Sequence, residues 1–99
     1  MISLDQVTPA SFSAHVGSAF QVRVSGSETV DAELISVTPF ATAAKGPRSE
    51  PFSLLFCVRS AKLPQQVYHL AHAVMGELEV FLVPVGLDER GLRMEAVFN

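Results

Sequence analysis

The segment GELEVFLVPVG, from Gly76 to Gly86, constrains the fold of this chain more than any other segment. Successive side chains of an extended chain point to opposite faces, so alternate residues share a face. One face is apolar throughout: Leu78, Val80, Leu82 and Pro84. The other face begins acidic and ends apolar: Glu77, Glu79, Phe81, Val83 and Val85. A strand with apolar residues on both faces needs cover on both, which predicts an all-β domain with this strand near its middle.

Five other segments alternate in the same way and are bounded by turn residues. They are Ala19 to Val24, Thr29 to Phe40, Phe52 to Val58, Gln66 to His72 and Leu92 to Phe98. Ile2 and Leu4 also alternate, which suits a short edge strand. The pattern of residues 29–40 changes phase at Leu34 and Ile35, and one inserted residue in a β-bulge produces such a change.

A tight turn is predicted at Asp88 to Gly91, closed by a glycine at positive φ. This turn pairs Leu78–Val85 with Leu92–Phe98 as the strongest local hairpin. The segment Ala41 to Pro51 has no periodicity and contains glycine and proline, so it is predicted to be a mobile loop, with either a functional role or the role of a tolerated insertion.

One short helix is predicted near the N-terminus. Thr8 suits the capping position, Pro9 the first helical position, and Gly17 a left-handed end. Phe12 and Val16 are spaced to share one side of this helix. A helix of this length needs a docking site, and we expect Phe12 to enter an open end of the sheet. The predicted fold is therefore all-β, a small antiparallel barrel or sandwich of about six to seven strands with one short N-terminal helix, in a single domain spanning 1–99.

Composition excludes several functional classes. A chain of 99 residues with 48% hydrophobic residues forms one core, and its net charge of −3 without a basic stripe argues against binding to nucleic acid. No run approaches the roughly 20 apolar residues that span a bilayer, and the first residues lack the pattern of a secretory signal. The single cysteine, Cys57, forms no internal disulfide, so we expect a reducing, cytoplasmic location, or a particle released when the cell lyses.

The histidines do not predict a metal site. His69 and His72 point to opposite faces of a strand, and no second cysteine or metal-binding motif supplies further ligands. His15 lies near the predicted helix end, where a positive charge is mildly favourable. All three are interpreted as structural or solvent-exposed, with no metal and no cofactor.

The carboxylates and the cysteine do not predict catalysis either. Glu77 and Glu79 share a strand face, with Glu95 expected across from them and Arg93 beside them, as a solvated charged surface. Cys57, between two apolar neighbours, is interpreted as a buried thiol. We therefore predict no catalytic residue.

The apolar residues on the second strand faces predict a protein interaction. That second face is covered either by barrel closure with the helix docked, or by another chain. Our candidates for the covered or shared surface are Leu55, Phe81 and Val83. The charged fraction of 17%, below the roughly 25% of typical soluble domains, also favours a subunit that binds a protein partner or itself.

Several segments together resemble a bacterial family of small domains of unknown function. They are EPFSLLF at 50–56, LPQ at 63–65, YHL at 68–70, GELEVFLVPVG at 76–86 and EAVFN at 95–99, and Phe12, Gly17 and Phe20 look similar as well. The resemblance covers nearly the whole chain and implies an all-β fold. Members of that family are often encoded near tail-collar-type proteins of phage-tail-like systems, which implies a structural or accessory role and supplies no catalytic residues.

Three functional hypotheses follow. The first is a non-enzymatic structural or protein-interaction domain, an accessory of a phage-tail-like assembly. The alternative is a small ligand-binding β-barrel module whose mouth, near Ala41–Pro51, holds a ligand. The third, an enzyme that uses Glu77, Glu79 or His72, ranks last.

Overall fold

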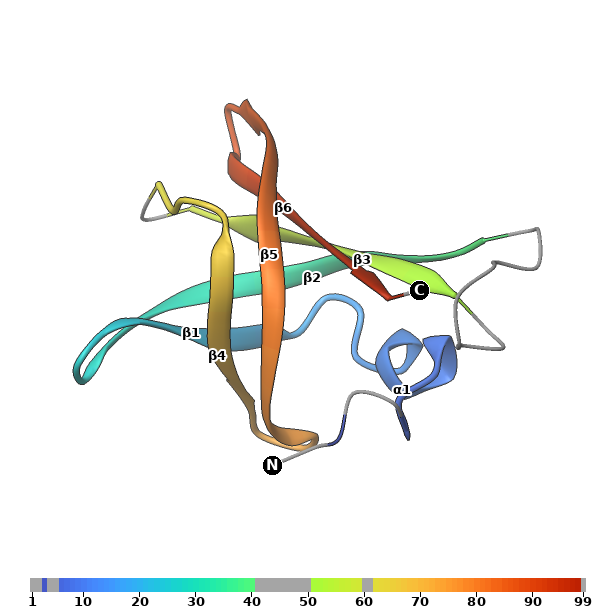
Figure 1. The fold of residues 1–99 in the computed structure, drawn as a ribbon. Helices are drawn as coiled ribbons and strands as arrows, with labels where there is room; N and C mark the ends of the chain where they lie inside the picture. The colour runs from blue at the N-terminus through green and yellow to red at the C-terminus, as the bar shows by residue number, and fades with distance from the viewer. Residues whose placement is uncertain (1–2, 4–5, 41–50, 60–61, 99) are drawn as a thin grey trace.

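Six strands close into an antiparallel barrel in the computed structural model, which describes residues 3, 6–40, 51–59 and 62–98. The elements are α1 (Pro9–Ser13), β1 (Ala19–Ser25), β2 (Glu28–Pro39), β3 (Phe52–Val58), β4 (Gln66–His72), β5 (Gly76–Asp88) and β6 (Gly91–Phe98). Around the barrel the order is β1-β2-β3-β6-β5-β4, with antiparallel neighbours (Figure 1). The predicted all-β fold with one short helix is confirmed, and of the two architectures left open the barrel is the correct one.

The strand boundaries follow the predicted segments closely. β3 and β4 have the predicted limits, and the other strands differ from the prediction by one or two residues at their ends. The predicted β-bulge is confirmed, because the register between β2 and β3 shifts between Leu34 and Ser36. Ile2, Leu4 and residues 41–50 of the predicted loop lie outside the described residues.

β5 has a different pairing from the one predicted. Its first half, Gly76 to Leu82, pairs with β4, and only Val83 to Asp88 pairs with β6. The prediction that Leu78–Val85 forms the hairpin with β6 is therefore wrong for Leu78 to Leu82. The reason is geometric, since the tight turn starts the hairpin at Asp88 and a second bulge shifts its register between Pro84 and Gly86.

Side chains from alternate positions of every strand fill the barrel interior. Among the described residues, the largest fully buried side chains include Phe20, Phe56, Leu70, Leu82 and Met94. The face of β5 predicted to be apolar points inward from Leu78 to Leu82, whereas Pro84 is exposed. The inward-facing side chains of all six strands form one hydrophobic cluster, so the barrel encloses a packed core.

α1 closes one end of the barrel, as predicted. The Thr8 N–H donates a hydrogen bond to Ser11 Oγ at 3.0 Å, and Pro9 occupies the first turn. Phe12 is fully buried against the rings of Phe52 and Phe98, whose centroids lie 5.9 and 5.8 Å away, near the C-terminal end of β6 (Figure 1).

The helix is shorter than predicted and does not include Val16. The helix ends at Ser13, so Val16 lies in the following turn and is 47% exposed. The prediction that Val16 shares one side of a helix with Phe12 is therefore wrong. Gly17 still ends the turn at a positive φ of 93°, as its predicted left-handed role requires.

Candidate functional site

The three residues predicted as an interaction surface lie together on the outside of the barrel. Phe81 is 49% exposed, while Leu55 and Val83 are half-buried. Glu95 of β6 connects two of them, because it pairs with Leu55 on one side and with Val83 on the other. The structure thus places the three predicted side chains on β3 and β5, the two strands that flank β6.

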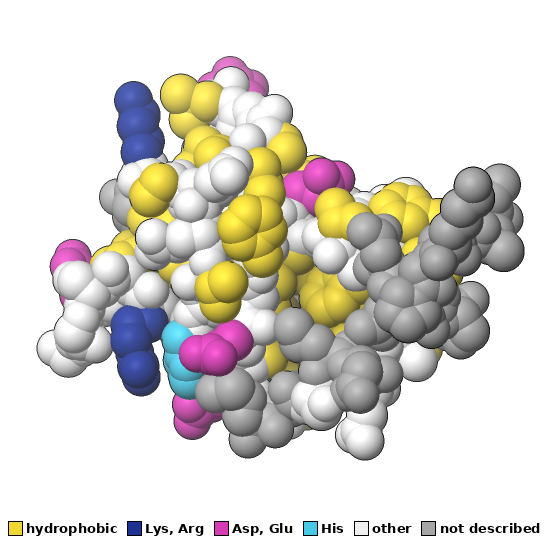
Figure 2. All heavy atoms as spheres, viewed as in Figure 1, with side chains coloured by type: hydrophobic (Ala, Val, Ile, Leu, Met, Phe, Trp, Pro, Cys, Tyr) yellow, Lys and Arg dark blue, Asp and Glu magenta, His cyan; other side chains and the backbone are white. Residues whose placement is uncertain are grey.

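Two further valines extend this surface, and sequence reasoning did not include them. Val67 of β4 pairs with Phe81 and is 60% exposed, and Val97 of β6, two residues from Glu95, is 50% exposed. We call the set the outer apolar face: Leu55, Val67, Phe81, Val83 and Val97. Figure 2 shows hydrophobic side chains gathered over β5 on the front of the molecule. The alternation of β4 and β6 contained the signal, since Val67 and Val97 occupy the outward positions of their strands.

The acidic residues of the strands are distributed differently from the prediction. Glu95 does not lie across from Glu77 and Glu79, because β6 pairs only with the second half of β5. Glu77 lies beside His69, with 2.7 Å between Oε1 and Nε2, although the ring N–H does not point at the carboxylate as a hydrogen bond requires. Arg93 is also placed differently, since its guanidinium contacts Asp88 at 3.0 Å.

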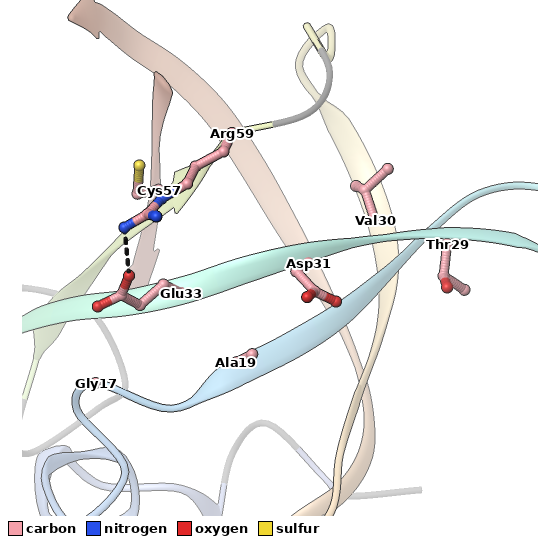
Figure 3. Close-up of a pocket in the computed structure, with 8 residues that line it drawn as sticks. All are labelled: Gly17, Ala19, Thr29, Val30, Asp31, Glu33, Cys57 and Arg59. Carbon is pink, nitrogen blue, oxygen red and sulfur yellow. Dashed lines mark hydrogen bonds and ion pairs between the residues drawn. The ribbon is translucent and has the colours of Figure 1, made fainter. Parts of the chain in front are cut away.

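A shallow groove of about 510 Å³ lies on the outside of the barrel, over β1, β2 and β3. Its lining comprises Gly17, Ala19, Thr29, Val30, Asp31, Glu33, Cys57 and Arg59 (Figure 3). Arg59 and Glu33 form an ion pair at 3.3 Å, whereas Asp31 accepts a hydrogen bond of 2.6 Å from the neutral amide of Gln21, which does not compensate its charge. The candidate nucleophile among these lining residues, the Cys57 thiol, is buried, so the lining does not present an accessible nucleophile next to a base.

Cys57 is buried in the wall of this groove, as predicted. Only 1% of the residue is exposed, and its thiol donates to the backbone oxygen of Arg90 at 3.5 Å. A reactive cysteine needs an accessible, electropositive setting that stabilises the thiolate. The thiol of Cys57 is instead buried against the β5–β6 turn, where Arg90 lies.

The histidines of β4 point to opposite faces, as predicted. His69 faces outward beside Glu77, and His72 is buried at the end of the strand. Both ring nitrogens of His72 have partners: Nδ1 accepts the backbone N–H groups of Val74 and Met75 at 3.1 Å each, and Nε2 lies 2.9 Å from Ser18 Oγ. Burial, and next the neighbouring His15, lower the pKa of His72.

Sequence reasoning missed these partners of His72. The available signal was a polar side chain at the last position of a strand, directly before a turn whose N–H groups need an acceptor. Within the described ranges, no group of three metal-binding side chains occurs, and no helix has the length and apolarity to cross a membrane.

Comparison with known proteins gives a match to one family. The model of a family described as a domain of unknown function (DUF6916) matches residues 7–98. Neither a curated protein nor a solved structure matches the chain.

Proposed function

Because the chain belongs to this domain family of unknown function over nearly its whole length, we propose a role for it from its surface. The domain is a non-enzymatic structural module that binds another protein chain through the outer apolar face. The observation that carries this proposal is the contiguity of that face. Its five apolar side chains come from four adjacent strands, β4, β5, β6 and β3, and lie on one side of a closed barrel.

The physical argument is that exposed apolar surface is favourable to bury. Isolated exposed hydrophobic residues are ordinary, whereas a contiguous patch centred on an aromatic side chain is typical of an interaction site. Phe81 supplies such an anchor, with Val67 beside it on the neighbouring strand. Glu95, between Leu55 and Val83, adds one charge to the face that a partner has to match with a donor or cation.

The chemistry of the remaining surface supports a non-enzymatic role. His72 uses both ring nitrogens within the fold, and Glu77 lies beside His69 and not beside His72. The carboxylates and the imidazole of the third hypothesis therefore do not converge in a cleft.

The alternative, a ligand-binding barrel, receives less support. The interior is filled by side chains, and Phe12, Phe52 and Phe98 occupy the end where α1 docks. The groove over β1–β3 has a volume typical of ligand sites, but it lies outside the barrel, and Arg59 and Asp31 already contact neighbouring side chains.

The finer assignment concerns the partner. We propose that the domain is an accessory of a phage-tail-like assembly, located in the cytoplasm until the particle is released. The support is the resemblance to a family encoded near tail-collar-type proteins, together with the outer apolar face, which a subunit of an assembly would bury.

Paired valine variants test the surface. Val67→Ser removes an apolar side chain from the outer apolar face, whereas Val74→Ser makes the same change at a 76% exposed position in the β4–β5 turn. Phe81→Ser removes the aromatic anchor. Because all three side chains are about half exposed or more, the free energy of unfolding of each variant should lie within about 0.5–1 kcal/mol of the wild-type value.

Association is then measured by sedimentation across concentration and by capture of the partner from the native host. We expect Phe81→Ser to weaken the association about tenfold or more, Val67→Ser to weaken it less, and Val74→Ser to leave it unchanged. Equal association of all four proteins would contradict a role for this face. A monomer at every concentration that captures no partner would remove the proposal itself.

A further inference from the structure

We propose that neutral His72 stabilises the pairing of β1 with β4, which we call the seam, and that protonation of its imidazole weakens this pairing. We call this pH-dependent contact the lock: it is closed when the imidazole is neutral and released when it is protonated. The seam is the place where the barrel closes, because β1 and β4 are far apart in sequence and complete the ring of strands. This inference concerns the fold's response to acid and does not depend on the proposed partner.

The seam has the shortest pairing of the barrel. β1 and β4 share two ladder pairs, Gln21 with Ala71 and Val22 with Leu70. The other five pairings between neighbouring strands each contain five to seven. The loss of one interaction therefore removes a larger fraction of this pairing than of any other pairing of strands.

His72 continues the seam with its side chain directly beyond the backbone pairs. It is the residue after Ala71, and its ring lies against Phe20 with centroids 4.5 Å apart. Its Nε2 atom lies 2.9 Å from Ser18 Oγ, just before β1. Ser18 is in turn fixed to β2, because its backbone oxygen accepts the N–H of Leu34 at 3.0 Å. His72 thus connects β4 through Ser18 to both β1 and β2.

The hydrogen bonds of His72 determine where its proton lies. The backbone N–H groups of Val74 and Met75 can only donate, so Nδ1 must accept, and the neutral ring carries its proton on Nε2. That N–H donates to Ser18 Oγ, and the Ser18 hydroxyl donates to the backbone oxygen of His15 at 2.6 Å. Every donor in this series of hydrogen bonds, from the Val74 and Met75 amides to the Ser18 hydroxyl, has an acceptor only while Nδ1 is unprotonated.

Protonation breaks this arrangement on the Nδ1 side. A proton on Nδ1 would face two N–H donors, which leaves both turn amides without their acceptor and places a positive charge in a buried site. Among the described residues, the groups that contact the ring carry no negative charge: they are the Phe20 ring, the turn amides of Val74 and Met75, the Ser18 hydroxyl, and His15, whose ring centroid is 4.7 Å away. Glu77, the nearest carboxylate along β5, faces His69 on the other side of the strand.

The direction of the pKa shift gives the pH range. Burial and then His15 lower the pKa of His72 below its ordinary value of 6.5. A histidine with a lowered pKa contributes its full stability above the ordinary value and loses it as the pH falls through the folded-state value. The lock is therefore closed at neutral pH, and it weakens once the pH falls below about 6.5.

Hydrogen exchange and imidazole NMR test the lock on the whole chain. Between pH 7.5 and 5, we expect the protection factors of the Val74 and Met75 amides and of the β1–β4 seam to fall first, before those of β3 and β6. The fall reaches about tenfold for each unit by which the fold lowers the pKa of His72. His72→Gln should abolish this local pH dependence, whereas the matched control His69→Gln, on the outer face of the same strand, should retain it.

Imidazole ¹⁵N shifts keep the proposal testable even if His72→Gln does not fold. In the wild type, we expect the neutral ring to carry its proton on Nε2 and to titrate below 6.5, and His15→Gln to raise the titration midpoint. A neutral ring protonated on Nδ1, a midpoint at or above 6.5, or seam protection that falls equally in His72→Gln would each overturn the lock.

Discussion

Replacing Phe12 with alanine should be the most costly single truncation in the N-terminal segment. Phe12 is fully buried, although its helix has only five residues. Its ring lies within 6.5 Å, centroid to centroid, of three others, Phe20, Phe52 and Phe98. A helix this short has negligible stability of its own, so the burial of this one ring holds it against the barrel.

The magnitude follows from these contacts. Truncation of a buried phenylalanine to alanine costs about 3–5 kcal/mol, and the three ring neighbours place Phe12 towards the upper end of that range. For a domain of this size, each kcal/mol corresponds to a change of roughly 4–8 °C in melting temperature, so the Phe12→Ala variant should melt at least about 12 °C below the wild type. A domain with a total stability of about 5 kcal/mol would be left barely folded.

Urea denaturation followed by circular dichroism measures the effect, and Val16→Ala is the control. Val16 follows in the next turn but is about half exposed, so its truncation should cost less than about 0.5–1 kcal/mol. A loss below about 1.5 kcal/mol for Phe12→Ala, or equal losses for the two variants, would show that α1 does not close the barrel end and would refute the reasoning.

Two further substitutions test the strand faces and the hairpin turn. Leu82→Ala should cost about 2–5 kcal/mol because Leu82 is fully buried, whereas Val83→Ala on the outer face should cost less than about 1 kcal/mol, and an unchanged melting temperature for Leu82→Ala would mean that the faces of β5 are reversed. Gly91→Ala should destabilise the fold by about 1–3 kcal/mol, because Gly91 has a φ of 138° and a Cβ would lie 2.6 Å from the Val58 oxygen. Gly86→Ala is its control in the same urea titration, since a Cβ there meets nothing within 4 Å, and equal losses would contradict this reading of the turn.

The local features of the barrel were predictable from sequence because each depends on neighbouring residues. Alternation gives the faces of a strand directly, which is why the limits of β3 and β4 agreed with the prediction. A change of phase at Leu34 and Ile35 revealed a bulge, because one inserted residue has no other way to keep both halves of the strand facing inward.

The features that were missed depend on residues far apart in the chain. The divided pairing of β5 reflects its length of 13 residues, which exceeds what either neighbouring strand can pair along its whole extent. The role of His72 depends on Ser18, 54 residues earlier in the sequence. No local pattern connects these two residues, because the closure of the barrel brings them together.

Closure of the barrel also explains why some apolar residues point outward. The interior of a small barrel accommodates one inward-facing set of side chains, and here that set already fills it. α1 covers the end of the barrel through Phe12 and does not extend over β4, β5 and β6, so it cannot cover Phe81 or Val67. Of the two ways to cover the second face of β5, the helix therefore accounts for the end of the barrel, and cover of the side by another chain is the proposal that the Phe81 and Val67 variants test.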